Sequence, residues 1–518
     1  MKKIWNLFYE KYQILIKNYP VSSIVLLFAT FFLTIFCDSD MMDEELLLKI
    51  FLFDFWLFLG FFYTEGNKDT KRKWGFIVTI GVSLFLYLLI NSKNNSVYEI
   101  GKRLSMTYSL VLVAMIFYQS LKNSGKKLSE YTIHLFSNVL KTSILYSILS
   151  IGLLIISEIF VSLVLNTDNY DFLLRIEILL LGLFYVPNLM IDITSDIQEK
   201  PSYFIKILVR YTLNSLIILA FIVIYLYLFR VIFFGEIPSN QIFRIIALLF
   251  ICYLPIWVLN NYYEDKTFFT KINHYLPIAF IPFILLQIYA LFIRINAYGV
   301  TNIRYLGVML IIFEIIYLIF YFKKIKYENL LFVFSGMVVI IFLCPWLNMY
   351  YISSHSQFKI VNELIMKDNL TNEEKRTLSS SYEYLEDTLE GKDLIKKYLT
   401  EHEEKIQNLD IHKYDYVYEM KDIDEIDIDN YHKLYFIDYS ENELMTNNMI
   451  IPYQEGEIDI TMIINEYKKV YHRDSFNEYF LKHNEFIING GKLIIQYINF
   501  NLEGDNISNL NIRGYFLK

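Results

Sequence analysis

The chain has 518 residues, of which 55% are hydrophobic and 18% aromatic, and its net charge is −8. The charge is uneven: residues 352–518 hold 18 basic and 32 acidic side chains, whereas the remainder is net positive. Nucleic acid and anionic lipid repel such an acidic segment, so we expect no nucleic-acid partner. The three cysteines and eight histidines lack the spacing of a metal site or a redox motif, so we predict neither metal nor cofactor.

Eleven hydrophobic runs follow one another between residues 20 and 350. A membrane-spanning helix needs about 20 mostly apolar residues, and each run reaches or approaches that length. The runs lie at residues 20–37, 45–63, 74–91, 105–121, 143–165, 172–191, 204–234, 242–260, 275–295, 305–322 and 329–350. We therefore predict an all-α polytopic membrane domain of about eleven transmembrane helices over residues 1–351, with the lipid bilayer as its first partner.

The distribution of Lys and Arg predicts the orientation. With a cytoplasmic N-terminus, the inside segments hold 19 basic residues and the outside loops 8, as the positive-inside rule requires. The first run lacks a small-x-small cleavage site, so we interpret it as an uncleaved span. Eleven crossings then place residues 352–518 outside a bacterial cell membrane, and an error of one span would move them inside.

The longest internal connector covers residues 122–142. Leu128, Tyr131, Leu135 and Val139 recur there at helical spacing. This pattern predicts either an amphipathic helix on the inner membrane surface or a cytoplasmic extension of the fifth span.

Residues 352–518 have the pattern of a small soluble α+β domain. Thr371 and Glu374 have the spacing of a capping box that opens a helix. Strands are predicted at 433–438 and 511–517, with a helix at 460–472. Residues 485–497 read as a β-hairpin, because Asn489-Gly490 separates two apolar runs.

Ionisable residues inside the runs are functional suspects, because charge in lipid is costly. One interpretation is a polar or proton-coupled path with Arg210 as the counter-ion. The alternative is structural pairing between helices, or snorkelling of the side chains that lie near span ends. The candidate residues are Asp54, Glu158, Glu177, Arg210 and Glu314.

A distinctive loop joins the ninth and tenth runs on the predicted outer side. It contains Arg294, Tyr298, Gly299, Thr301, Arg304 and Tyr305. Gly299 permits a tight turn and Thr301 can cap the next helix. The two arginines run against the positive-inside bias. They either bind an anionic group or hold the carbonyls of a rigid turn.

This loop carries a resemblance to a known family. The pattern Arg294-Ile-x-x-Tyr-Gly-x-Thr-x-x-Arg-Tyr305, followed by two spans and then Ser353-x-x-Ser356-Gln357, resembles the bacterial membrane family called domain of unknown function 4153. The resemblance covers roughly residues 140–365 and implies the architecture. It implies no activity or catalytic residue.

Three hypotheses about function follow. The first is a sensory or scaffold protein of the cell envelope, whose outer domain binds an envelope protein or lipid partner and is coupled to the membrane. The second is a secondary transporter or permease subunit that uses the intramembrane carboxylates. The third is an envelope enzyme acting on a lipid-linked substrate, although the sequence contains no familiar catalytic motif.

Overall fold

The computed structural model describes most of the chain. The described residues are 12–37, 43–67, 72–160, 170–194, 201–234, 240–263, 268–367, 370–396, 415–420, 433–441, 449–453, 456–471, 479–480, 482–488, 491–503 and 506–518. They form two compact units by their contacts: residues 1–362 with 384–396, and residues 363–383 with 397–518. We call these the membrane unit and the C-terminal unit.

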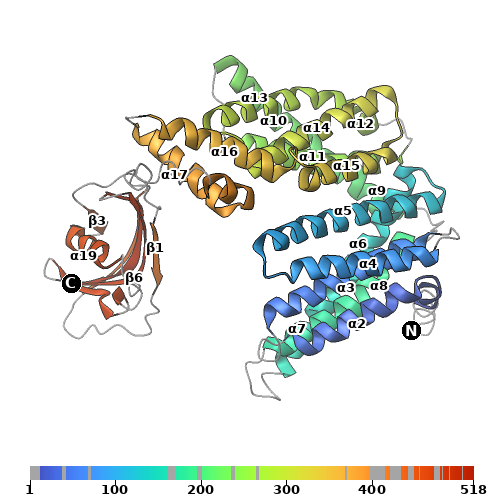
Figure 1. Ribbon diagram of the computed structural model, residues 1–518, viewed down its shortest axis with the longest axis horizontal. Helices are drawn as coiled ribbons and strands as arrows, with labels where there is room; N and C mark the ends of the chain where they lie inside the picture. The colour runs from blue at the N-terminus through green and yellow to red at the C-terminus, as the bar shows by residue number, and fades with distance from the viewer. Residues whose placement is uncertain are drawn as a thin grey trace. The chain divides into compact units, whose positions relative to one another are not determined.

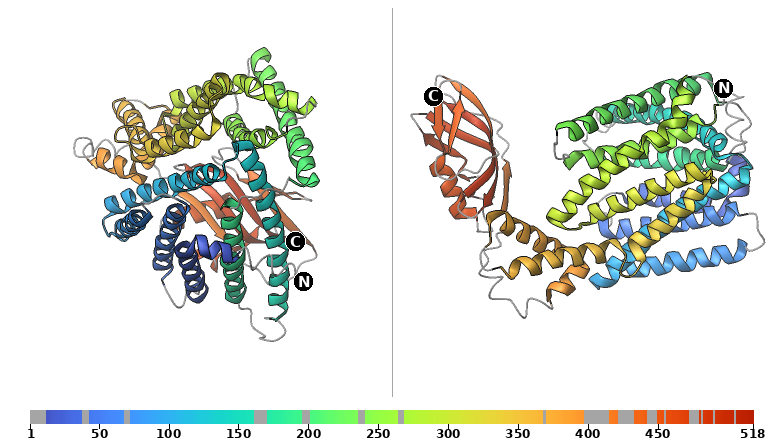
Figure 2. Two further views of the ribbon diagram at one scale, coloured as in Figure 1. Left: turned by 90° about the vertical axis from the view of Figure 1, so that its right-hand side faces the viewer. Right: turned by 90° about the horizontal axis from the view of Figure 1, so that it is seen from above.

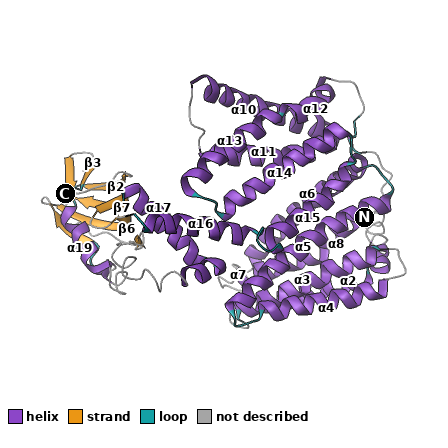
Figure 3. Ribbon diagram, turned by 45° about the horizontal axis from the view of Figure 1, so that its top comes forward, coloured by secondary structure: helices purple, strands orange, loops and turns teal. Residues whose placement is uncertain are grey.

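The described part of the membrane unit is helical (Figures 1 and 3). Its helices are α2 (Pro20–Phe36), α3 (Glu44–Gly66), α4 (Arg72–Ile90), α5 (Asn95–Ser124), α6 (Leu128–Phe160), α7 (Tyr170–Leu180), α8 (Val186–Thr194), α9 (Tyr203–Ile207), α10 (Asn214–Phe234), α11 (Asn240–Asn260), α12 (Phe268–Ala279), α13 (Ile281–Tyr298), α14 (Asn302–Lys323), α15 (Leu330–Leu343) and α16 (Met349–Ile365), whose last residues belong to the C-terminal unit. The π-helix η2 (Leu181–Tyr185) joins α7 to α8, the π-helix η3 (Leu208–Leu213) joins α9 to α10, and the 3₁₀-helix η4 (Tyr327–Asn329) precedes α15.

Nine helices of the described chain are long and apolar enough to cross a membrane. A tenth candidate is α2 together with the short helix before it, which meets it at an angle of 111°. The eleventh predicted run corresponds to a shorter apolar helix over residues 327–343. The expected multi-span helical membrane architecture is confirmed, and Figure 2 shows its long helices running alongside one another.

From Leu128 onward, the connector before the fifth span is continuous with that span. Helix α6 runs without interruption for 33 residues from Leu128 to Phe160. Of the two interpretations drawn from the sequence, the structure agrees with the extension of the fifth span.

The C-terminal unit contains a five-stranded antiparallel sheet and a separate β-hairpin. Its elements are α17 (Asn372–Asp387), whose last residues belong to the membrane unit, β1 (Asp415–Met420), β2 (Leu434–Glu441), β3 (Ile450–Tyr453), β4 (Gly456–Asp459), α19 (Thr461–Tyr471), β5 (Glu485–Ile488), β6 (Gly491–Glu503) and β7 (Asn506–Leu517). The strand order is β1-β6-β7-β2, with β5 paired to β6, and β3 pairs with β4.

The core of this unit lies between the sheet and α19. Ile463, Ile464 and Tyr467 of α19 are buried against Ile495 and Phe500 of β6. Figure 1 shows α19 against one face of the sheet. The predicted α+β class, the hairpin and the helix are confirmed. Strands β1, β3 and β4 were not predicted.

Candidate functional site

The loop between α13 and α14 is a tight turn whose carbonyl groups bind its own arginine. Arg304 donates hydrogen bonds to the carbonyl oxygens of Tyr298 at 2.9 Å and Gly299 at 2.7 Å. Its guanidinium also lies 5.5 Å from the centre of the Tyr298 ring. Gly299 ends α13 with φ of 67° and ψ of −172°, a region open essentially only to glycine. The arrangement matches the turn interpretation of this loop.

Helix α16 also forms hydrogen bonds with this turn. The Gln357 amide donates to the carbonyl oxygens of Tyr298 and Val300, each at 3.0 Å. Ser356 Oγ accepts from the Val300 amide at 2.8 Å. A Cβ at Gly299 would lie 3.0 Å from Gln357 Nε2 and 2.5 Å from Ile360 Cδ1. The two halves of the quoted sequence pattern therefore meet in space.

The start of α14 is satisfied by a residue far away in the sequence. Thr301 occupies the N-cap position but its side chain makes no capping hydrogen bond, so that expectation was wrong. Instead, the Tyr384 hydroxyl accepts from the Asn302 amide at 3.3 Å and donates to Asn302 Oδ1 at 2.7 Å. The hydroxyl of Tyr305, one turn later, donates to the carbonyl of Leu347.

An ion pair fixes the segment that follows Tyr384. Arg103 of α5 forms a bidentate pair with Glu390, in which Nη2 lies 2.8 Å from Oε2. The guanidinium also stacks on the ring of Tyr350, 3.7 Å from its centre. Arg103 is only 8% exposed and the Glu390 side chain is 20% exposed, so this pair is partly shielded from water. Nearby, Ser354 Oγ lies 3.1 Å from Thr388 Oγ1.

We call this set of contacts the junction. It joins α5, the 298–305 turn, α16 and the segment 384–390, all within the membrane unit. These contacts have a mechanical role: they hold four segments together through hydrogen bonds and one partly buried ion pair.

The intramembrane carboxylates lie at separate places. Glu177 on α7 accepts hydrogen bonds from Tyr146 and, at 2.9 Å, from Ser150 on α6. Glu314 on α14 is fully buried beside Gln287 of α13. With the amide oriented to satisfy both groups, Gln287 donates to Glu314 at 2.6 Å and accepts from the Ala247 amide of α11. Each of these contacts joins side chains of different helices, and neither includes Arg210.

Two further members of the predicted polar set, Asp54 and Arg210, are buried in other helices. Asp54 on α3 is 6% exposed, and its Oδ2 has no hydrogen-bond partner among the described residues. Arg210 is 1% exposed in the π-helix η3, 5.8 Å from the ring centre of Tyr263. The side chain of Glu158 lies outside the described part of the structure. Arg294 is partly buried near the end of α13. A single polar path through Asp54, Glu158, Glu177, Arg210 and Glu314 stays a prediction.

The comparisons with known proteins agree with the sequence pattern. The family described as "Domain of unknown function (DUF4153)" matches residues 21–372, which is more than half of the chain. The chain belongs to this family. A relative of 20% identity over 385 residues is the uncharacterized protein PM1469 of Pasteurella multocida (strain Pm70). That alignment covers 71% of this chain and 63% of the relative, and no solved structure matches.

The part of the chain that matches DUF4153 contains the 298–305 turn, Ser356, Gln357 and Arg103, whereas Tyr384 and Glu390 lie beyond it. The roles of Arg103, Tyr384 and Glu390 were not predicted from the sequence. Gln287 was also missed, because its amide is neutral and only ionisable residues in the spans were selected as candidates. Arg103 gave a signal that was available: a basic residue on the predicted outer side, where the bias runs against it.

Sequence reasoning also missed Glu65, at the end of α3. Its carboxylate accepts from the backbone amides of Val21 at 2.8 Å and Ser22 at 3.1 Å, and from the Ser22 hydroxyl. These amides are the unsatisfied donors at the start of α2, where a carboxylate is favourable. The sequence signal was an acidic residue at a span end, opposite a helix that begins with Pro20.

Proposed function

We propose that this membrane protein is a sensor or scaffold of the bacterial cell envelope. In this proposal the C-terminal unit is extracytoplasmic, binds an envelope protein or lipid, and passes its state to the membrane helices through the junction. The observation that supports it most is the path of the chain. The chain leaves the membrane unit after Asn362, returns at Tyr384 and is held there by Glu390.

Along this path, the C-terminal unit is connected to the membrane unit by more than one segment of the chain. Helix α16, which contains Gln357, leads out of the membrane unit and ends in the C-terminal unit. Helix α17 begins in the C-terminal unit, and its last turn brings Tyr384 to the loop before α14. A change in the C-terminal unit can therefore reach the 298–305 turn through two helices, α16 and α17. The cell-membrane location and the cytoplasmic N-terminus are part of this proposal and rest on the Lys and Arg distribution.

The test is whether a disturbance in the C-terminal unit reaches the turn. Ile464→Ala removes a fully buried side chain from the core of that unit and should cost about 2–5 kcal/mol there. Hydrogen–deuterium exchange of the full chain in lipid nanodiscs would be followed at residues 298–302. We expect faster exchange at this turn in Ile464→Ala, and a smaller increase when Glu390→Gln has already released the ion pair.

Met462→Ala is the matched control, because Met462 lies on the same helix and is 85% exposed. It should leave exchange at the turn unchanged. If Ile464→Ala accelerates exchange only within the C-terminal unit, the two units are independent and the sensor proposal fails.

A secondary transporter is the second candidate, and one observation favours it. Glu314 is a fully buried carboxyl group whose partner Gln287 also contacts the backbone of a third helix. A transporter requires such a group to exchange a proton during its cycle. Infrared difference spectra would show a protonated carboxyl band that titrates and disappears in Glu314→Gln. A band that does not titrate would leave Glu314 a structural residue.

A further inference from the structure

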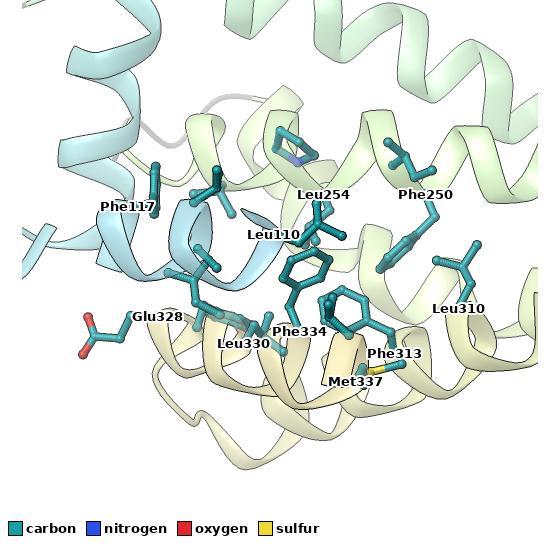
Figure 4. A pocket seen from close by; sticks show the side chains of 18 of the residues that line it. Leu110, Phe117, Phe250, Leu254, Leu310, Phe313, Glu328, Leu330, Phe334 and Met337 are labelled. Carbon is teal, nitrogen blue, oxygen red and sulfur yellow. The ribbon is translucent and has the colours of Figure 1, made fainter. Parts of the chain in front are cut away.

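The membrane unit contains a cavity of about 780 Å³ between five helices. Its walls come from α5, α6, α11, α14 and α15 (Figure 4). This volume lies within the range of natural small-molecule sites, about 300–1,000 Å³. None of the residues of the junction or of the predicted polar path lines it.

The walls are apolar along almost their whole length. Leu110 and Phe117 of α5 and Leu254 of α11 line one part of the cavity. Phe334 and Met337 of α15 line another part (Figure 4). Only Thr132, Tyr327 and Glu328 among the lining side chains carry a polar group. Such a cavity excludes sugars, nucleotides and ions, because their polar groups would lose hydration without gaining partners.

The cavity is open at the flank of the helix bundle. Leu110, Phe334 and Ile251 line it and remain 39%, 38% and 59% exposed. All three lie in hydrophobic helices, at positions that face hydrocarbon in a membrane. The molecules that meet this opening at the highest concentration are the acyl chains of the bilayer.

One end of the cavity is polar and rich in cations. Glu328 lies at one end of the lining, away from Phe250 and Phe313 (Figure 4). The adjoining connectors carry the exposed side chains of Lys122, Lys127, Lys323, Lys324 and Lys326. A phospholipid whose chain enters the cavity would place its phosphate near these amines, which attract anionic headgroups.

We propose that this cavity binds an acyl chain of an anionic membrane phospholipid. The chain lies between α5, α11 and α15, and the headgroup stays at the lysine-rich end. The bound lipid fills the space between helices that would otherwise lose packing contacts, and links α5 of the junction to α11 and α14. The proposal is independent of the sensor hypothesis.

The test uses the full chain in vesicles of phosphatidylethanolamine and phosphatidylglycerol. A trace of phosphatidylglycerol carries a photoreactive diazirine in one acyl chain, and adducts are mapped by mass spectrometry. We expect adducts to concentrate at Leu310, Phe334 and Met337, relative to Ile340, which is exposed on α15 but lies outside the cavity.

Leu110→Trp places an indole in the cavity and should reduce these adducts about tenfold, the change expected when roughly two methylenes lose their burial. Met106→Trp is the control, since Met106 is exposed one turn earlier on the same helix and does not line the cavity. Met337→Trp enters from the opposite wall and serves if Leu110→Trp does not fold.

Equal labelling of cavity residues and Ile340, or adducts that survive in the folded tryptophan variants, would overturn the proposal. Cavity labelling by a diazirine fatty acid but not by the phospholipid would also overturn it, because the ligand would then be a free acid.

Discussion

Gly299 is the residue on which the shape of the junction depends most. Its backbone has φ of 67° and ψ of −172°, and Ile360, Gln357 and Ser356 occupy the space of a Cβ. Both the conformation and the packing therefore exclude a side chain. Arg304 and Gln357 then bind carbonyl groups whose directions this backbone sets.

Gly299→Ala should lower the stability of the membrane unit by about 1–3 kcal/mol, because it adds backbone strain to a crowded position. Thermal unfolding in detergent measures the loss. Gly336→Ala is the control: Gly336 is in α15 and a Cβ there meets nothing within 4 Å. An unchanged melting temperature in Gly299→Ala would mean that the turn is not held as described.

At the scale of elements, the junction depends on pairing across long sequence distances. Arg103 and Glu390 are 287 residues apart and make a two-pronged contact that a lysine does not reproduce. The neighbouring pair Lys102–Glu99 is exposed and local, with 2.9 Å between its charged atoms. Because Arg103 and Lys102 are neighbours in α5, the contributions of the two ion pairs to stability can be compared.

Arg103→Lys and Arg103→Ala should each cost about 1.5–3 kcal/mol, the range for hydrogen bonds to charged groups. Lys102→Ala should cost less than about 1 kcal/mol, as is usual for exposed pairs. Chemical unfolding of the detergent-solubilised protein measures these changes. A mild Arg103→Lys effect would show that charge alone holds the segment 384–390.

Helix α17 gives a prediction for the dependence on pH. The hydrogen bond from Lys367, with further bonds from Thr371, lowers the pKa of Glu374 to about 2. A lowered pKa in the folded state stabilises the protein above the ordinary pKa of 4.5. This stabilisation is lost as the pH falls from there through about 2. The difference in melting temperature between the wild type and Glu374→Gln should therefore shrink over that interval, and a constant difference would exclude the capping-box ion pair.

The sequence predicts the parts of this molecule that depend on local pattern. Hydrophobic length located the spans, Asn489-Gly490 located the hairpin, and Thr371 with Glu374 located the start of α17, whose reciprocal hydrogen bonds the structure shows. The role of Arg304 was one of two interpretations drawn from the loop.

Contacts between distant segments were beyond the reach of the sequence pattern. Nothing near Arg103 indicates Glu390, and nothing near Asn302 indicates Tyr384. The capping of α14 was wrong for the same reason, since a hydroxyl 82 residues away does what Thr301 was expected to do. The apolar cavity was also invisible, because its lining residues are ordinary members of hydrophobic spans.

At the scale of the whole molecule, the central claim is that the C-terminal unit faces outside. The sensor proposal needs this orientation, because an envelope component reaches the unit only there. The most direct measurement is thiol labelling on intact cells, in a variant with Cys37, Cys252 and Cys344 replaced by serine. Met462→Cys and Ile487→Cys then provide single thiols at positions 85% and 86% exposed in the C-terminal unit.

Lys324→Cys is the matched control on the opposite side of the predicted topology, in the exposed connector after α14. With a membrane-impermeant maleimide, we expect both C-terminal thiols to react on intact cells, and the thiol at position 324 to react only after lysis. The reverse pattern would contradict the account.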